Sequence, residues 1–153
     1  MLTSGPGGSL VNAALIGQQG SATILKNPNA RIRIAAGADT AGSVSVTLGG
    51  ATLTNGLRSP VVNNYTLVNP GNQNVTVRIN GVVVSNESRN LVAGADYTLL
   101  VFGTPAAGEV RLLADDNRLP SLSTNTRIRL VNGVANSSPQ TLLLDNSLLV
   151  TDV

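Results

Sequence analysis

Short stretches in which apolar and polar residues alternate run through the middle of the chain. The clearest, residues 75–84, alternates on either side of Asn80-Gly81. A period of two predicts strands with one buried face, and Asn-Gly between two such runs is a strong hairpin signal. Comparable runs lie at residues 43–54, 65–69, 97–102 and 109–115. About seven strands is the usual number for a sandwich, so the pattern predicts an all-β, immunoglobulin-like antiparallel β-sandwich.

One local motif bears on that architecture. Leu91, Gly94 and Tyr97 are spaced as L-x-x-G-x-x-Y immediately before a predicted strand. Immunoglobulin-like sandwiches often place a tyrosine here, with its hydroxyl bonded back to the preceding loop. The alternative is an ordinary half-buried strand tyrosine, and the spacing leaves both interpretations open.

The chain also repeats itself. The stretch ARIRIAAG at Ala30–Gly37 recurs in similar form as TRIRLVNG at Thr126–Gly133. The second copy begins at residue 126 and the first at residue 30, so the two are offset by 96 residues. The same offset aligns residues 31–57 with residues 127–153 without a gap and places Gly49-Gly50 opposite Asp145-Asn146. Repetition at this length predicts tandem domains, of which the second copy holds only the opening strands.

The N-terminal residues match the end of the same unit more weakly. Residues 13–27 resemble residues 99–117, because each contains a strand ending in glycine, a short turn and a second strand. We therefore expect three parts: residues 1–29 as the closing strands of a preceding repeat, residues 30–120 as one complete sandwich, and residues 121–153 as opening strands.

The stretches ARIRIAAGADTAGSVSVTLGGATL, LVAGADYTLLVFG and EVRLLADDNRLPSLSTNTRIRLVNG resemble the bacterial domain-of-unknown-function family 4397. The resemblance covers residues 30–120 in full and residues 126–153 in part. The chain departs from the family at Gly49-Gly50, where an acidic residue is usual. The resemblance implies exported, often lipid-anchored, tandem immunoglobulin-like domains, and it implies no biochemical activity.

Composition excludes several kinds of chemistry. The chain has no cysteine and no histidine, which excludes thiol catalysis, zinc sites built from these residues and imidazole acid–base catalysis. Its eight acidic residues suggest no facing pair. Ten basic residues are spread along the chain without a cluster or stacking aromatics, and no apolar run approaches membrane-spanning length. We therefore expect no enzyme, no cofactor, no nucleic-acid binding and no transmembrane segment.

Two polar patterns remain as candidate sites. Asp115, Asp116 and Asn117 are consecutive oxygen donors, which makes them a candidate calcium site, although a polar turn between domains is the favoured interpretation. Arg31 and Arg33 alternate with apolar residues, which favours a charged guard on an edge strand. The functional alternative is an arginine ladder that docks against an acidic strand of a neighbour.

The incomplete ends lead to a hypothesis about function. Partial sandwiches expose apolar faces and backbone groups, so the ends either pair within one chain, pair between chains, or belong to a longer protein. Pairing between chains would be head-to-tail strand complementation and would build a filament. The leading hypothesis is a non-enzymatic extracellular or cell-surface structural protein that self-associates. The alternative is a surface adhesion or ligand-binding module for carbohydrate or protein. The residues expected to assemble are Ile16, Ile24, Leu142, Leu144, Leu148 and Val150.

Overall fold

The computed structural model describes residues 1–134, 137–151 and 153. The described chain consists of strands and turns, with one short 3-10 helix at Asp39–Ala41. The strands are β1 (Leu2–Ser4), β2 (Val11–Ile16), β3 (Ala22–Leu25), β4 (Ala30–Ala38), β5 (Ser43–Leu48), β6 (Ala51–Arg58), β7 (Val61–Val62), β8 (Thr66–Val68), β9 (Gly71–Ile79), β10 (Val82–Leu91), β11 (Asp96–Gly103), β12 (Gly108–Asp115), β13 (Leu142–Leu144) and β14 (Ser147–Val150).

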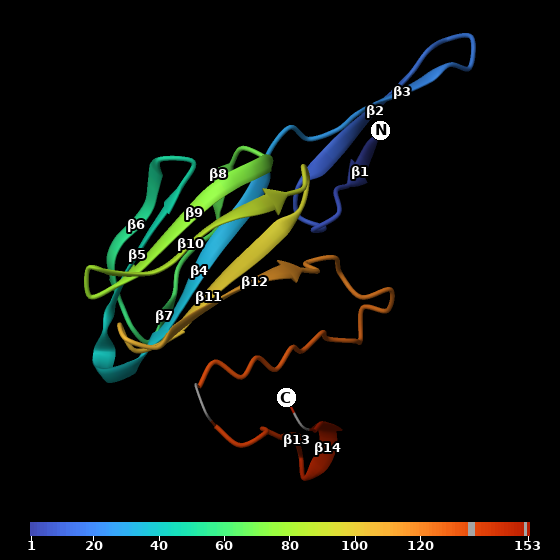
Figure 1. The fold of residues 1–153 in the computed structure, drawn as a ribbon. Helices are drawn as coiled ribbons and strands as arrows, with labels where there is room; N and C mark the ends of the chain where they lie inside the picture. The colour runs from blue at the N-terminus through green and yellow to red at the C-terminus, as the bar shows by residue number, and fades with distance from the viewer. Residues whose placement is uncertain (135–136, 152) are drawn as a thin grey trace.

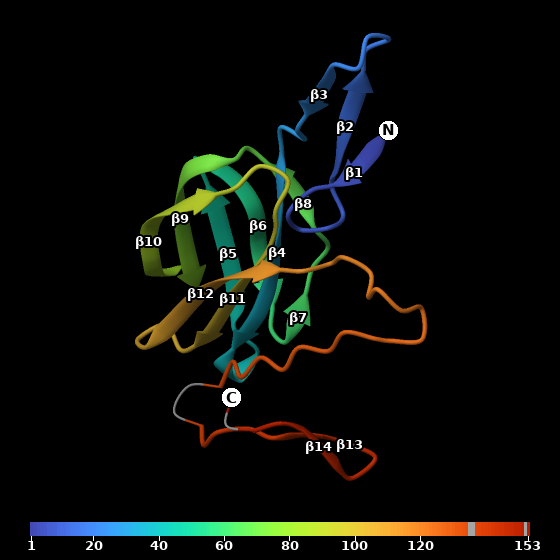
Figure 2. The same cartoon turned by 90° about the vertical axis from the view of Figure 1, so that its right-hand side faces the viewer.

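Strands β4 to β12 form a sandwich of two sheets (Figures 1 and 2). One sheet has the order β10-β9-β5-β6. The other has the order β12-β11-β4-β7, and β8 also pairs with β4. The predicted all-β sandwich is confirmed.

The core lies between these two sheets and follows the alternation in the sequence. Ile32 and Ile34 of β4, Val44 and Val46 of β5, and Leu99 of β11 are each at most 1% exposed. Burying one such side chain contributes about 1.5–3 kcal/mol to stability. The alternate residues of β4 and β5 are only partly buried, so each strand has a core face and an outer face.

Strand β4 lies inside its sheet. It pairs in parallel with β11 on one side and antiparallel with β7 and β8 on the other. The expectation that Arg31 and Arg33 guard an edge strand is therefore wrong. Alternation within one strand reports which side chains are buried, but it carries no information about how many strands lie beside it.

Of the two interpretations of the tyrosine motif, the structure shows the corner. The Tyr97 hydroxyl accepts a hydrogen bond of 2.9 Å from the backbone N–H of Val92, in the loop between β10 and β11. The side chain is otherwise buried, with 7% exposed. This bond fixes the loop against the strand that follows it and confirms the corner interpretation.

The two hairpins that the sequence aligns have the same local structure. Leu48 pairs with Ala51 and Val46 with Thr54, with a bulge between Val46 and Thr47. Leu144 pairs with Ser147 and Leu142 with Val150, with a bulge between Leu142 and Leu143. Both turns, Gly49-Gly50 and Asp145-Asn146, have positive φ at both residues. Residues with the same offset of 96 thus occupy equivalent positions in β5–β6 and β13–β14.

Two further pieces lie outside the sandwich, above and below it in Figure 1. Strands β1, β2 and β3 form a three-stranded sheet in that order, and β13 and β14 form a separate hairpin. Residues 126–133, which were expected to open a second repeat as a strand, are assigned to no strand. Their counterpart β4 pairs with β11, and β11 here already has β4 and β12 as neighbours.

Within the described residues, no helix has the length and apolar character needed to cross a bilayer.

Replacing Tyr97 by Phe tests the corner. The change removes the acceptor of the Val92 N–H and keeps the ring, so we expect the free energy of unfolding to fall by about 1–2 kcal/mol. Urea denaturation measures this, and an unchanged m-value would show that the same surface unfolds. A loss below a few tenths of a kcal/mol would mean that the hydroxyl contributes nothing to the corner.

Candidate functional site

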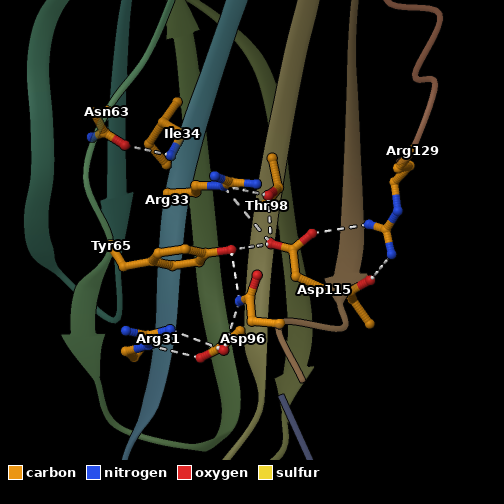
Figure 3. Close-up of polar contacts among 11 residues, drawn as sticks. Arg31, Arg33, Ile34, Asn63, Tyr65, Asp96, Thr98, Asp115 and Arg129 are labelled. Atoms are coloured by element: carbon orange, nitrogen blue, oxygen red, sulfur yellow. Dashed lines mark hydrogen bonds and ion pairs between the residues drawn. The ribbon is translucent and has the colours of Figure 1, made fainter. Parts of the chain in front are cut away.

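The parallel pairing of β4 with β11 places Arg31 opposite Asp96 on the outer face of the sheet. The Arg31 Nε donates to Asp96 Oδ1 at 2.8 Å and its Nη2 donates to Oδ2 at 3.0 Å (Figure 3). The Asp96 side chain has no exposed surface, whereas 23% of the Arg31 side chain is exposed. A planar guanidinium that meets a carboxylate at two points fixes both the distance and the register of the two strands.

A glycine-rich loop covers Asp96. The Gly7 N–H donates to the Gly94 carbonyl at 3.0 Å, and the Asn117 N–H donates to the Gly7 carbonyl at 2.8 Å. A Cβ atom on Gly7 would lie 2.4 Å from the Asp96 backbone nitrogen. Only glycine permits this approach, so the loop between β1 and β2 is part of the structure that buries Asp96.

The charge of Asp96 is stabilised despite its burial. Burial alone would raise the pKa of this carboxyl, but hydrogen bonds from Arg31 and Asn117 outweigh that effect and lower the pKa below its usual value. Asp96 is therefore ionised at neutral pH, and its negative charge is matched by the guanidinium of Arg31.

Tyr65 connects the two arginines of β4 to the end of β12. The Cζ atoms of Arg31 and Arg33 lie 4.5 Å and 4.7 Å from the centre of its ring. Its hydroxyl donates to Asp115 Oδ2 at 2.7 Å and accepts from Asn117 Nδ2 at 3.2 Å. Burial and the bond to Asp115 raise the pKa of Tyr65.

Asp115 joins four side chains from different parts of the fold. Besides Tyr65, its Oδ2 accepts from Thr98 Oγ1 at 2.6 Å and lies 3.9 Å from Arg33 Nε. Its Oδ1 accepts from Arg129 Nη1 at 2.9 Å (Figure 3). Arg33 and Arg129 occupy equivalent positions in the repeated sequence, so one carboxylate contacts both copies of the motif.

The neighbouring residues Asp116 and Asn117 are also bonded. Asp116 accepts from Arg118 at 2.7 Å and 2.8 Å, and it forms a further ion pair with Arg127. The hydrogen bonds from Arg118 hold the pKa of Asp116 well below its usual range. Asn117 Nδ2 donates to Asp96 Oδ2 at 2.8 Å.

The structure thus brings the three candidate calcium ligands close together, but arginines supply the positive charge around them. Within the described residues, no group of three or more Asp, Glu, His or Cys side chains is arranged to hold a metal ion. Calcium binding stays the less favoured alternative to a polar turn, and the structure does not test it. We call the set of bonded residues the arginine–aspartate cluster; its members are Arg31, Arg33, Tyr65, Asp96, Thr98, Asp115, Asp116, Asn117, Arg118, Arg127 and Arg129.

Tyr65, Asp96 and Thr98 were not among the site residues expected from the sequence. One signal was available, because Asp96 and Thr98 alternate on their strand as Arg31 and Arg33 do on theirs. That signal identifies a site only once the parallel register is known, because the register places Asp96 and Thr98 opposite Arg31 and Arg33.

The residues expected to assemble lie on the two outer pieces. Ile16 and Ile24 share one face of the β2–β3 pair and are 68% and 61% exposed. Leu142, Leu144 and Val150 share a face of the β13–β14 hairpin, with Leu144 53% exposed. Leu148 pairs with Leu143 on the opposite face of that hairpin, so these six residues do not form one surface.

Comparison with known proteins places the chain in a family. The family model described as a domain of unknown function, DUF4397, matches residues 30–147. The chain belongs to this family. The match to DUF4397 begins where β4 begins and continues through the whole sandwich and the arginine–aspartate cluster to β14, so the resemblance seen in the sequence is confirmed.

The chain is also similar to a solved structure, the crystal structure of a candidate cell adhesion protein from Bacteroides uniformis. It is 18% identical over 63% of this chain and 53% of that chain, with a TM-score of 0.37. The chain therefore spans about half the length of that protein. None of the curated proteins compared matches this DUF4397 chain.

Replacing Asp96 by Asn tests the cluster. The change leaves Arg31 without its buried counter-charge, so we expect a loss of roughly 2–3 kcal/mol in unfolding free energy at pH 7. Replacing Glu109 by Gln is the matched control, because it removes an exposed ion pair with Arg111 and should cost under about 1 kcal/mol. Equal losses in the two variants would contradict the special role of Asp96.

The same variant predicts a pH dependence. Because folding lowers the pKa of Asp96, its contribution is complete above the unfolded value of about 3.9 and is lost as the pH falls through the folded value. The stability of the wild-type chain should therefore fall more steeply below about pH 4 than that of Asp96→Asn. Denaturant titrations from pH 6 to pH 2.5 measure the difference, and parallel curves would contradict it.

Proposed function

We propose that this DUF4397 chain is a non-catalytic structural protein that works outside the cell or at its surface, and that its copies join head to tail through their terminal strands. The observation that carries the proposal is that two pieces of the chain lie outside the sandwich at opposite ends of it (Figure 2), and that each has large exposed apolar side chains. Contiguous exposed apolar surface on a folded protein commonly marks a site of contact with another molecule.

The charges at the two ends are opposite. Residues 1–29 contain Lys26 and no acidic residue, whereas residues 130–153 contain two aspartates, including Asp145, and no basic residue. Contact between like ends would bring like charges together, and contact between unlike ends would pair them. This difference favours a head-to-tail arrangement over a symmetric one.

The strand arrangement supports packing between faces rather than insertion of a strand. In the sandwich, β11 is flanked by β12 and β4; the corresponding central strand of the N-terminal sheet, β2, is flanked by β3 and β1. Strand insertion beside β2 would have to displace β1. Packing β13–β14 over the β2–β3 face displaces nothing. Strand complementation is confined to addition at the edge of β3, which has no further strand beside it in the described residues.

The hairpin β13–β14 also has a face suited to burial. Leu142 and Leu144 are equivalent in the repeat to Val46 and Leu48. The side chains of Val46 and Leu48 are buried in the sandwich core. The proposed interface therefore uses the Leu142 and Leu144 face and excludes Leu148.

Light scattering over a range of concentrations tests this proposal. The wild-type mass should rise with concentration. A tail variant, Leu142→Asp with Leu144→Asp, should raise the concentration needed for association by at least about tenfold, because it places charge in an apolar contact. The head variant Ile16→Asp with Ile24→Asp should do the same. Leu148→Asp, on the other face of the hairpin, is the matched control and should associate as the wild type does.

Mixing the two variants tests the direction of assembly. Each variant keeps one intact end, so an equal mixture should form dimers that do not grow further. A wild-type chain that stays monomeric at every concentration would contradict the proposal. Association of the mixture into long polymers would contradict the head-to-tail arrangement.

The second candidate is a surface adhesion or ligand-binding module, which is favoured by a groove of about 630 Å³ on the outer face of the β4–β11 sheet. Tyr97 and Phe102 are each 7% exposed, and the ring of Tyr65 is contacted by two arginines. In the described residues the groove therefore lacks the open aromatic surface that sugar binding commonly uses, so a protein partner fits it better than a carbohydrate.

A further inference from the structure

The groove on the outer face of the β12-β11-β4-β7 sheet has two halves. Its polar half is formed by Arg33 of β4, Thr98 of β11 and Asp115 at the end of β12, and Asp116 lines the adjoining hollow. Its apolar half is formed by Ala35 and Gly37 of β4, Leu100 of β11 and Leu113 of β12. A ligand for such a surface needs positive charge at one end and small or apolar side chains at the other.

Residues 126–133 of the chain itself match this requirement. Arg127 pairs with Asp116, and Arg129 donates to Asp115 Oδ1 and to the Ala114 carbonyl, each at 2.9 Å. Further along, Val131 and Gly133 line the apolar half of the groove. The contacts come from alternate residues, as expected for an extended segment that presents one face.

No strand pairing holds residues 126–133 in the groove. The structure assigns residues 126–133 to no strand, and β11 has its full complement of neighbours in β4 and β12. The segment can therefore leave the groove by breaking contacts made by its arginines and by Val131 and Gly133, without opening a strand ladder.

We propose that this groove is a binding site for residues 126–133 of a second copy, which exchange with the chain's own segment. The receiving residues lie between 33 and 116, and the donating residues follow them after the linker 117–125. Every copy carries both halves, so the same ion pairs form within one chain or between two. The site uses neither terminal hairpin, so it stands whether or not the hairpins assemble.

Disulfide trapping tests this exchange cleanly, because the chain has no native cysteine. A Cβ atom on Gly133 would lie 3.4 Å from Leu100 Cδ1, so Leu100→Cys and Gly133→Cys place two thiols close together. One variant carries Leu100→Cys and the other Gly133→Cys, and both carry Ile16→Asp and Ile24→Asp to remove hairpin assembly. Mixed and oxidised, they should give a covalent heterodimer.

Three controls define the result. Both substitutions in one chain should form the bond internally, which checks the geometry. Pairing Gly133→Cys with Ala51→Cys, an exposed position on the other sheet, sets the background. Adding Arg127→Gln and Arg129→Gln to the Gly133→Cys chain should lower the heterodimer yield at least about fivefold. A yield at background, or one insensitive to the arginines, overturns the proposal.

A second measurement needs no cysteine. A fluorescent peptide of residues 124–134 should bind the full chain, and it should bind Arg127→Gln with Arg129→Gln more tightly because that chain's own segment competes less well. The same peptide with both arginines replaced by glutamine should not bind. Failure of the wild-type peptide to bind either chain overturns the proposal and leaves the hairpin interface unaffected.

Discussion

The bidentate ion pair between Arg31 and Asp96 is the constraint on which the rest of the structure depends. It forms only when β4 and β11 run in parallel with Arg31 opposite Asp96. The same register places Arg33 beside Thr98 and, through it, Asp115. A carboxylate with no exposed surface would be strongly destabilising without this partner, so the pair excludes other registers of the opening strand.

The segments outside the sandwich are tied to the same group of charges. The loop containing Gly7 covers Asp96 from the N-terminal side, and Arg129 reaches Asp115 from the C-terminal side. The outer face of the sandwich therefore contacts both the segment that precedes β4 and the segment that follows β12. What remains uncovered is the apolar surface of β2–β3 and β13–β14, which the proposed head-to-tail contact would bury.

Local patterns in the sequence predicted the strands and the Asn80-Gly81 turn and gave the Tyr97 corner as one of two interpretations, because each depends on residues close together in the chain. The repeat also predicted the β13–β14 hairpin, including its turn at Asp145-Asn146. The strand neighbours were not predictable in the same way. Whether Arg31 lies on an edge strand, and whether residues 126–133 find a strand to pair with, depends on contacts between segments far apart in the chain, such as the 65 residues between Arg31 and Asp96.

The most direct test of this account is a double-mutant cycle between Arg31→Gln and Asp96→Asn, measured by urea denaturation at pH 7. If the pair fixes the β4–β11 register, the two losses should be strongly non-additive, with a coupling energy of about 2 kcal/mol or more. Losses that add to within about 0.5 kcal/mol would show that the two residues act independently. That result would contradict the claim that this ion pair organises the sandwich and its outer face.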